Sequence, residues 1–224
     1  MKRLVLIFCL LFSLPAHGVK FERAGGNYFS TNGELVAPVR CLKLRNSFLY
    51  SRAKREYRVF KKLYKRKTLK KYLKRVVFCS ELWLGPVREA RGTYNVKNNT
   101  VFIEVNYKSN DTLYLLNHEF SSILLLKHKE LKEFKKEWVS NNVGSYKPLF
   151  DERYGDNQWR LTHTELRMRG FLYPYSRTDF ENDFNVMAAY YKSDYLRSRL
   201  LKAARNYSRI KNKFNLLKKF YKKL

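Results

Sequence analysis

Acidic residues are scarce in this chain of 224 residues, which has 19 aspartates and glutamates against 47 lysines and arginines. The resulting formal charge of +28 is outside the range usual for a secreted enzyme, and it favours polyanionic partners: nucleic acid, acidic glycans, anionic lipid or acidic protein. The basic residues are concentrated in the segment from Arg52 to Arg75 and in the C-terminal stretch from Arg197. Solvated helix faces would give the same pattern, so the charge indicates a class of partner only.

Cysteine is also scarce, with three residues at positions 9, 41 and 79. Cys9 lies within a short N-terminal apolar run, which leaves Cys41 and Cys79 for the rest of the chain. In an exported protein such a pair predicts one disulfide that joins the N-terminal arm to the core. Two buried free thiols are equally compatible with the sequence.

The apolar run at the N-terminus, Leu4–Phe12, is too short to span a bilayer as a helix. It follows Lys2 and Arg3 and precedes Ala16-His17-Gly18, which has small residues at the two positions that define signal cleavage. This order is typical of a secretory signal peptide. We therefore expect cleavage near Gly18, a secreted or periplasmic protein, and no transmembrane segment in the mature chain.

The hydrophobic content of 45% is sufficient for one core in a chain of this length. The predicted organisation is a signal peptide over residues 1–18, an irregular N-terminal arm over 19–46, and a single domain over 47–224. The arm is expected to be irregular because Gly25-Gly26, Asn32-Gly33 and Pro38 are turn signals.

The order of the expected elements predicts an α+β fold. Helical spacing over 47–64, continued over 68–74, precedes short strands at 76–79 and 82–84 and a hairpin formed by 91–96 and 100–105. Asn110 or Asp111 can then cap a helix that carries His118. An aromatic, irregular segment follows to Thr162.

Two further helices are expected after a turn at 170–175. Asp179 or Glu181 opens the first, which continues to Tyr191. The second is a basic helix from about residue 194, whose apolar residues recur at alternating steps of four and three from Leu196 to Leu224. Its apolar face should pack on the core or on a partner helix, and a membrane-surface helix is the alternative.

A candidate catalytic motif, His118-Glu119, lies in the helix that Asn110 or Asp111 caps. A complete H-E-x-x-H sequence places two imidazoles on one helix face as zinc ligands, with the glutamate beside the metal-bound water. Here Ser122 occupies the position of the second histidine. An ordinary polar pair on a half-buried helix is the simpler interpretation of an isolated His-Glu dipeptide.

Three separated segments, 115–124, 170–175 and 181–184, together resemble motifs of the secreted bacterial zinc-binding metallopeptidases of the gluzincin type. The resemblance covers roughly residues 47–191. It implies a zincin-like α+β domain in which a small sheet or hairpin packs on the helix of His118, followed by a helical part. It also implies zinc as the cofactor and a peptide or protein as the substrate.

Within this resemblance, His118 matches the first zinc ligand and Glu119 the general base that takes a proton from zinc-bound water. Tyr175 matches a tyrosine that hydrogen-bonds the developing oxyanion. Asn182 stands at the position of the acidic ligand, and Val186 at that of a supporting carboxylate. A shift of one residue would make Glu181 or Asp183 the ligand that accompanies His118.

Another histidine is a poor substitute for the one that is missing. His128 would lie about 15 Å from His118 along a continuous helix and would point elsewhere. His163 precedes the turn at Gly170 and is free to fold back, although a surface or packing role is commoner for such a residue.

The sequence favours two functions over a third alternative, a purely structural exported protein whose charge only keeps it soluble. The first is an exported, zincin-like metallopeptidase relative with an altered metal site, in which catalysis is either weakened or lost. The second is a cationic, non-enzymatic protein that uses its basic helices to bind an anionic envelope polymer or nucleic acid.

Overall fold

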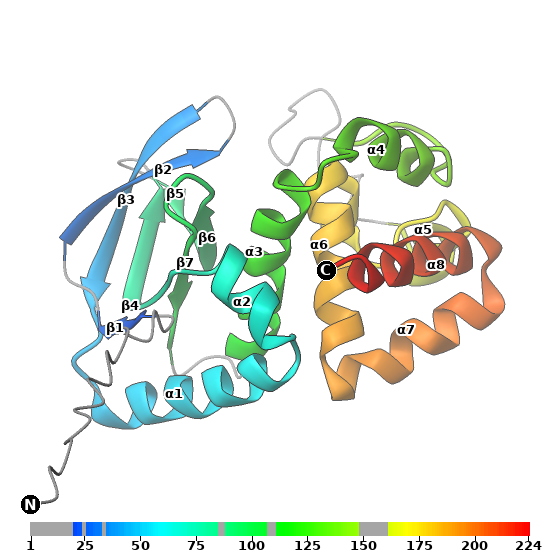
Figure 1. Cartoon of the computed structure of the whole chain (residues 1–224). Helices are drawn as coiled ribbons and strands as arrows, with labels where there is room; N and C mark the ends of the chain where they lie inside the picture. Colours follow the sequence, from blue (N-terminus) through cyan, green and yellow to red (C-terminus); the bar gives the residue numbers. More distant parts are fainter. Residues whose placement is uncertain (1–19, 24–25, 33–34, 85–87, 107–110, 148–160) are drawn as a thin grey trace, which may run out of the picture.

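The computed structural model describes residues 20–23, 26–32, 35–84, 88–106, 111–147 and 161–224, so the expected signal peptide lies outside the described residues. A sheet forms one side of the molecule and most helices form the other, with helix α3 between them (Figure 1). The predicted α+β class is confirmed. Within the described ranges, no helix has the length and apolar character needed to cross a membrane.

The sheet has a central strand, β4 (Arg75–Leu84), that pairs with parallel and antiparallel neighbours. Its strand order is β2-β3-β4-β7-β6, and β1 and β5 also pair with β4. The other strands are β1 (Lys20–Arg23), β2 (Gly26–Asn32), β3 (Leu35–Lys43), β5 (Arg88–Glu89), β6 (Gly92–Asn95) and β7 (Thr100–Glu104). The predicted hairpin is confirmed as β6 and β7, with Asn99 at a φ of 53° between them.

The prediction of an irregular arm over 19–46 is wrong for the described residues, because β1, β2 and β3 lie there. Both β1 and β3 are paired with β4, which is distant in the sequence. Pairing with a distant strand stabilises β1 and β3 even though the turn residues of the arm predict irregular structure. The predicted disulfide is confirmed: Cys41 in β3 and Cys79 in β4 are bonded, with their Cα atoms 5.3 Å apart.

The helices begin and end close to the expected positions in most of the chain. They are α1 (Ser47–Lys62), α2 (Arg66–Tyr72), α3 (Thr112–Leu126), α4 (Leu131–Val139), α5 (His163–Met168), the short 3-10 helix η2 (Pro174–Arg177), α6 (Phe180–Lys192), α7 (Asp194–Asn206) and α8 (Ser208–Lys222). Asp179 caps α6, as predicted, through a hydrogen bond from the backbone of Asn182. Two helices, α4 and α5, lie between the helix of His118 and the turn at 170–175, where none was expected.

Helix α3 is at the centre of the fold because it has almost no polar face. Every residue from Leu115 to Leu125 is buried, and a helix that is buried all round must be covered on every side. Its neighbours are α1, α6, β6 and β7. The polar side chains of α3, including His118 and Glu119, are consequently inside the protein.

The basic C-terminal helix is divided at Tyr207, whose extended backbone separates α7 from α8. Ile210, Phe214 and Leu217 of α8 are buried in the main core. Packing on the core is therefore confirmed for this apolar face. The membrane-surface alternative is wrong for it, because the same side chains are already covered.

Candidate functional site

The candidate site lies where α3 and α6 pack side by side. His118, Glu119 and Ser122 come from α3, and Glu181, Asn182 and Asn185 come from α6. Residues four apart on a helix share a face, so His118 and Ser122 face α6 together, as their spacing predicts. Segments that are far apart in the sequence are thus joined at one helix interface.

Ser122 and Asn185 form a buried pair. The Asn185 amide donates a 2.6 Å hydrogen bond from Nδ2 to Oγ of Ser122, and neither residue has more than 1% of its surface exposed. Asn185 was not predicted as a site residue. The place at which a complete H-E-x-x-H motif would carry its second imidazole is therefore filled by a hydroxyl bonded to an amide.

His118 is buried among aromatic rings, with 6% of its surface exposed. The centroids of the Tyr114 and Tyr175 rings lie 5.8 and 5.9 Å from that of the imidazole. Burial lowers the pKa of His118 to about 4, and an interaction with the Asn182 side chain opposes this shift. The imidazole is therefore neutral at pH 7, and its Nδ1 has no hydrogen-bond partner among the described residues.

Two carboxyl groups, those of Glu119 and Glu181, lie close enough to influence each other. Burial raises the pKa of Glu119 well above its usual value, and the charge of Glu181 raises it further. Burial also raises the pKa of Glu181, while hydrogen bonds with Tyr94 and Ser122 oppose the shift. Two neighbouring carboxylates in a low-dielectric site disfavour simultaneous ionisation, so the pair favours retention of a proton.

The sheet contributes two residues to this site that sequence reasoning missed, Tyr94 and Gly92 of β6. Burial and the Glu181 carboxyl raise the pKa of the Tyr94 hydroxyl. A Cβ atom at position 92 would lie 2.6 Å from Oε1 of Glu119, so a glycine is required for the close approach of this side chain. A glycine at the start of a strand is a signal for such an approach, but it does not identify the partner.

Asp183 is not brought together with His118. Its Oδ2 lies 2.5 Å from Nζ of Lys213 and accepts hydrogen bonds from Trp138 Nε1 at 2.9 Å and from the Tyr146 hydroxyl at 3.0 Å. Glu181 and Asp183 are two residues apart on α6, so their side chains leave the helix on nearly opposite sides. Of these two predicted ligands, only Glu181 faces α3.

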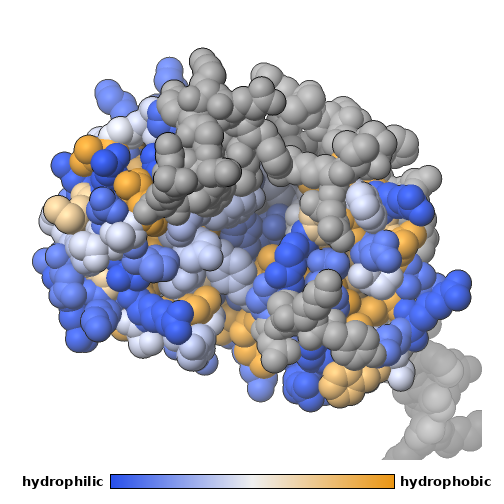
Figure 2. Space-filling model, turned by 180° about the vertical axis from the view of Figure 1, so that it is seen from behind, coloured by the Kyte–Doolittle hydropathy of each residue, from blue (hydrophilic) through white to orange (hydrophobic). Residues whose placement is uncertain are grey.

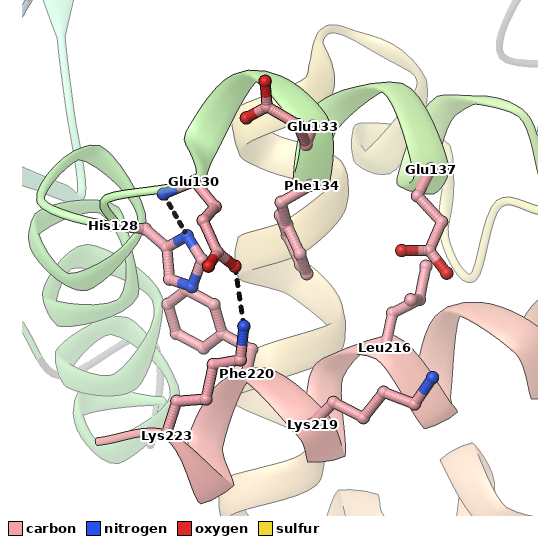
Figure 3. A pocket seen from close by; sticks show the side chains of 9 residues that line it. All are labelled: His128, Glu130, Glu133, Phe134, Glu137, Leu216, Lys219, Phe220 and Lys223. Carbon is pink, nitrogen blue, oxygen red and sulfur yellow. Dashed lines mark hydrogen bonds and ion pairs between the residues drawn. The ribbon is translucent and has the colours of Figure 1, made fainter.

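The remaining histidines lie elsewhere. His128 stacks on Phe220, with ring centroids 4.9 Å apart, and its Nδ1 accepts a hydrogen bond from the backbone of Glu130. Figure 3 shows these residues in a pocket between α4 and α8, where Glu130 also pairs with Lys223. His163 is an exposed residue of α5 beside Tyr173.

A resident zinc ion is a poor fit to the residues present. Structural and catalytic zinc sites use at least three protein ligands, mostly imidazole, thiolate or carboxylate. In the part of the chain that the structure describes, no three histidine, cysteine, aspartate or glutamate side chains are grouped to hold a metal ion. At the α3–α6 interface the expected ligand positions hold the Ser122 hydroxyl and the Asn182 amide, both already hydrogen-bonded.

Figure 2 shows the face opposite to that of Figure 1, which is hollowed near its centre, between the sheet side and the helical side. The slight exposure of His118 and Glu119, 6% and 8%, leaves little of either side chain at the surface.

Comparisons of this chain with protein-family models, curated proteins and solved structures found no match.

Proposed function

We propose that this protein has a zincin-type scaffold in which a hydrogen-bonded polar cluster replaces the metal centre, and that it binds polypeptide segments without hydrolysing them. The observation that carries the proposal is the buried hydrogen bond between Asn185 and Ser122. A hydroxyl that accepts an amide proton is a weak zinc ligand, and the amide fills space that an imidazole would need.

The spatial arrangement of the three motifs supports the scaffold. Tyr175 lies beside His118, and Asn182 interacts with the same imidazole. Glu119 lies next to Glu181 on the neighbouring helix. These are the relationships that the resemblance to zinc metallopeptidases implies, with neutral residues at two of the ligand positions.

Polypeptide is the favoured ligand because of what surrounds the cluster. Strand β6 is the last strand in the sheet order and carries Tyr94, which contacts Glu181. The edge of a sheet offers backbone hydrogen-bonding groups to an extended segment. On β6 the partly exposed residue is Gly92, because the other three residues are buried and β2 contacts this strand. Without an activated water, such a segment would be held by the strand and by the buried polar groups, and not cleaved.

The test is to restore the two changed ligands together, as Ser122→His with Asn182→Glu. We expect zinc in less than stoichiometric amount in the purified wild-type chain and close to one zinc per chain in the double variant, measured by elemental mass spectrometry. The matched control is Ser121→His with Asn182→Glu, because Ser121 is adjacent and equally buried but bonds to Tyr221 of α8.

One result would contradict the proposal directly. Stoichiometric zinc in the wild type, together with peptide hydrolysis that is abolished in Glu119→Gln while the fold is retained, would show an active metallopeptidase. Hydrolysis should be followed with a mixture of unstructured peptides, so that no single cleavage preference decides the outcome.

A further inference from the structure

The outer surface of α1 and α2 is strongly basic and has almost no acidic residues. It includes eleven exposed lysine and arginine side chains, here called the α1–α2 basic surface: Lys54, Arg55, Arg58, Lys61, Lys62, Lys65, Arg66, Lys67, Lys70, Lys71 and Lys74. The only acidic residue from Ser47 to Lys74 is the half-buried Glu56. None of the eleven takes part in an ion pair within the described part of the chain.

Two apolar side chains lie among these charges. Phe48 is 64% exposed and Val59 is 39% exposed. On α1 they share the outermost stripe with Arg55 and Lys62, at steps of seven, four and three residues. The packing of α1 on the core uses the opposite stripe, including Leu49, so Phe48 and Val59 do not serve the core.

This surface continues onto a third element. Thr68 Oγ1 of α2 donates a 3.0 Å hydrogen bond to the carbonyl of Leu224, which places the end of the chain against α2. The exposed Lys222 is two residues away. Figure 1 shows α1 along the lower edge of the molecule, with α2 above it.

We propose that the α1–α2 basic surface docks on an anionic phospholipid surface, with Phe48 and Val59 entering the interfacial layer and the lysines and arginines contacting phosphate groups. The charge by itself would also suit nucleic acid. Apolar side chains within the basic stripe favour lipid, because interfacial helices combine buried apolar area with attraction to anionic headgroups. This inference does not depend on the function proposed for the α3–α6 site.

The test places a fluorescent reporter on the surface, with Phe48→Trp in the full chain. The vesicles contain phosphatidylcholine alone, or phosphatidylcholine with phosphatidylglycerol, and their acyl chains are brominated near the headgroup. The reporter's emission, after subtraction of the wild-type signal, should be quenched severalfold by the anionic vesicles and little by the neutral ones. The matched control is Tyr195→Trp on α7, because Tyr195 is 71% exposed and α7 lies on the helical side of the molecule, away from α1 (Figure 1).

The comparison is between two positions on the same protein, so binding through any other segment would not quench the reporter at position 48 more than the one at position 195. Quenching at position 48 should be lost when Arg55→Glu and Lys62→Glu are added. Equal quenching at positions 48 and 195, or none at either, would overturn the proposal. So would binding to duplex DNA that is tighter than binding to anionic vesicles at the same salt and unchanged by Phe48→Ser, a result that assigns the surface to nucleic acid.

Discussion

Asn185 of α6 donates its amide proton to the Ser122 hydroxyl of α3, at 2.6 Å, inside the protein. This contact ties together the two helices that carry the candidate site. It also makes the polar cluster a structural element, because it satisfies part of the hydrogen-bonding capacity of two buried polar groups, which also interact with Glu181.

Removal of one partner should therefore destabilise the fold. We expect Asn185→Ala to lower the free energy of unfolding by about 2 kcal/mol, because the buried Ser122 hydroxyl loses the hydrogen bond from the amide and a small cavity forms. Urea unfolding followed by circular dichroism measures the change. In Ser122→Ala/Asn185→Leu both polar groups are absent, so this double variant should be more stable than Asn185→Ala, and a lower stability would disprove the interpretation.

The buried ion pair between Lys213 and Asp183 predicts a larger effect. Both side chains are almost fully inaccessible, and Lys213 also donates to the carbonyl of Gly170 at 2.7 Å. Asp183→Asn leaves a buried ammonium without its counter-charge, so we expect a loss of about 3–5 kcal/mol in the free energy of unfolding. Asp183→Asn/Lys213→Met removes both charges and should recover part of that loss.

The same variants distinguish a stabilising role of Asp183 from a role as a zinc ligand. If Asp183 only stabilises the fold, then Asp183→Asn/Lys213→Met should not change zinc content in the Ser122→His/Asn182→Glu background. If zinc is lost while the circular dichroism spectrum is unchanged, Asp183 is a zinc ligand in that background.

Lys192 predicts a pH-dependent stability. Its ammonium lies 4.5 and 4.4 Å from the centroids of the Tyr64 and Tyr221 rings, and burial lowers its pKa from 10.5 to about 8. The unfolded chain therefore binds more protons than the folded chain between about pH 8 and 10.5. The free energy of unfolding contributed by Lys192 should rise with pH across that window, by roughly 1–2 kcal/mol, and should be constant below about pH 8, where Lys192 is protonated in both states.

The measurement compares the wild type with Lys192→Met from pH 7 to pH 10 by chemical unfolding. The difference in stability between the two proteins should shift in favour of the wild type as the pH rises. Lys202→Met is the matched control, because Lys202 is an exposed lysine of α7. A pH-independent difference for Lys192→Met would show that the tyrosine rings and the carbonyl of Leu63 compensate fully for burial.

Gly92 gives a prediction for the site itself. Gly92→Ala would place a methyl group 2.6 Å from Oε1 and 2.9 Å from Cγ of Glu119, so either the Glu119 side chain or β6 must shift. We expect a loss of about 1–3 kcal/mol in stability, measured by thermal unfolding. If the protein binds peptides at this site, their affinity should fall as well.

The control for this variant is Gly144→Ala. Gly144 has a φ of +84°, and a Cβ atom there would meet no atom within 4 Å. Its substitution should cost about 1 kcal/mol through backbone strain alone and should leave peptide affinity unchanged. If both substitutions change peptide affinity equally, Gly92 has no specific role at the binding site.

The chain's local signals predicted the parts of the fold that depend on neighbouring residues. The hairpin of β6 and β7 follows from a polar turn between two β-rich segments, and α6 starts after the capping residue Asp179. Strands β1 and β3 were not predicted, because their stability comes from β4, which follows them at a distance in the sequence. Helix α5 begins with a capping box at Thr162 and Glu165, which is a local signal present in the sequence.

The candidate site was predicted only in part. His118 lies beside Tyr175, and Glu119 lies near Glu181, so two pairs of the predicted residues are in proximity. Asp183 is on another face of its helix, and the contributions of Gly92, Tyr94 and Asn185 depend on how α6 and β6 approach α3.

The sequence by itself determined the α+β class, the excess of positive charge, the pair of cysteines and the polar residues of α3. Each depends on composition or on spacing along one helix or strand. Only the tertiary structure decided that Ser122 bonds to Asn185, that Asp183 pairs with Lys213, and that Phe48 lies uncovered among basic side chains. The physical reason is that a side chain's partner comes from another element, and the packing of those elements fixes which of several polar neighbours it meets.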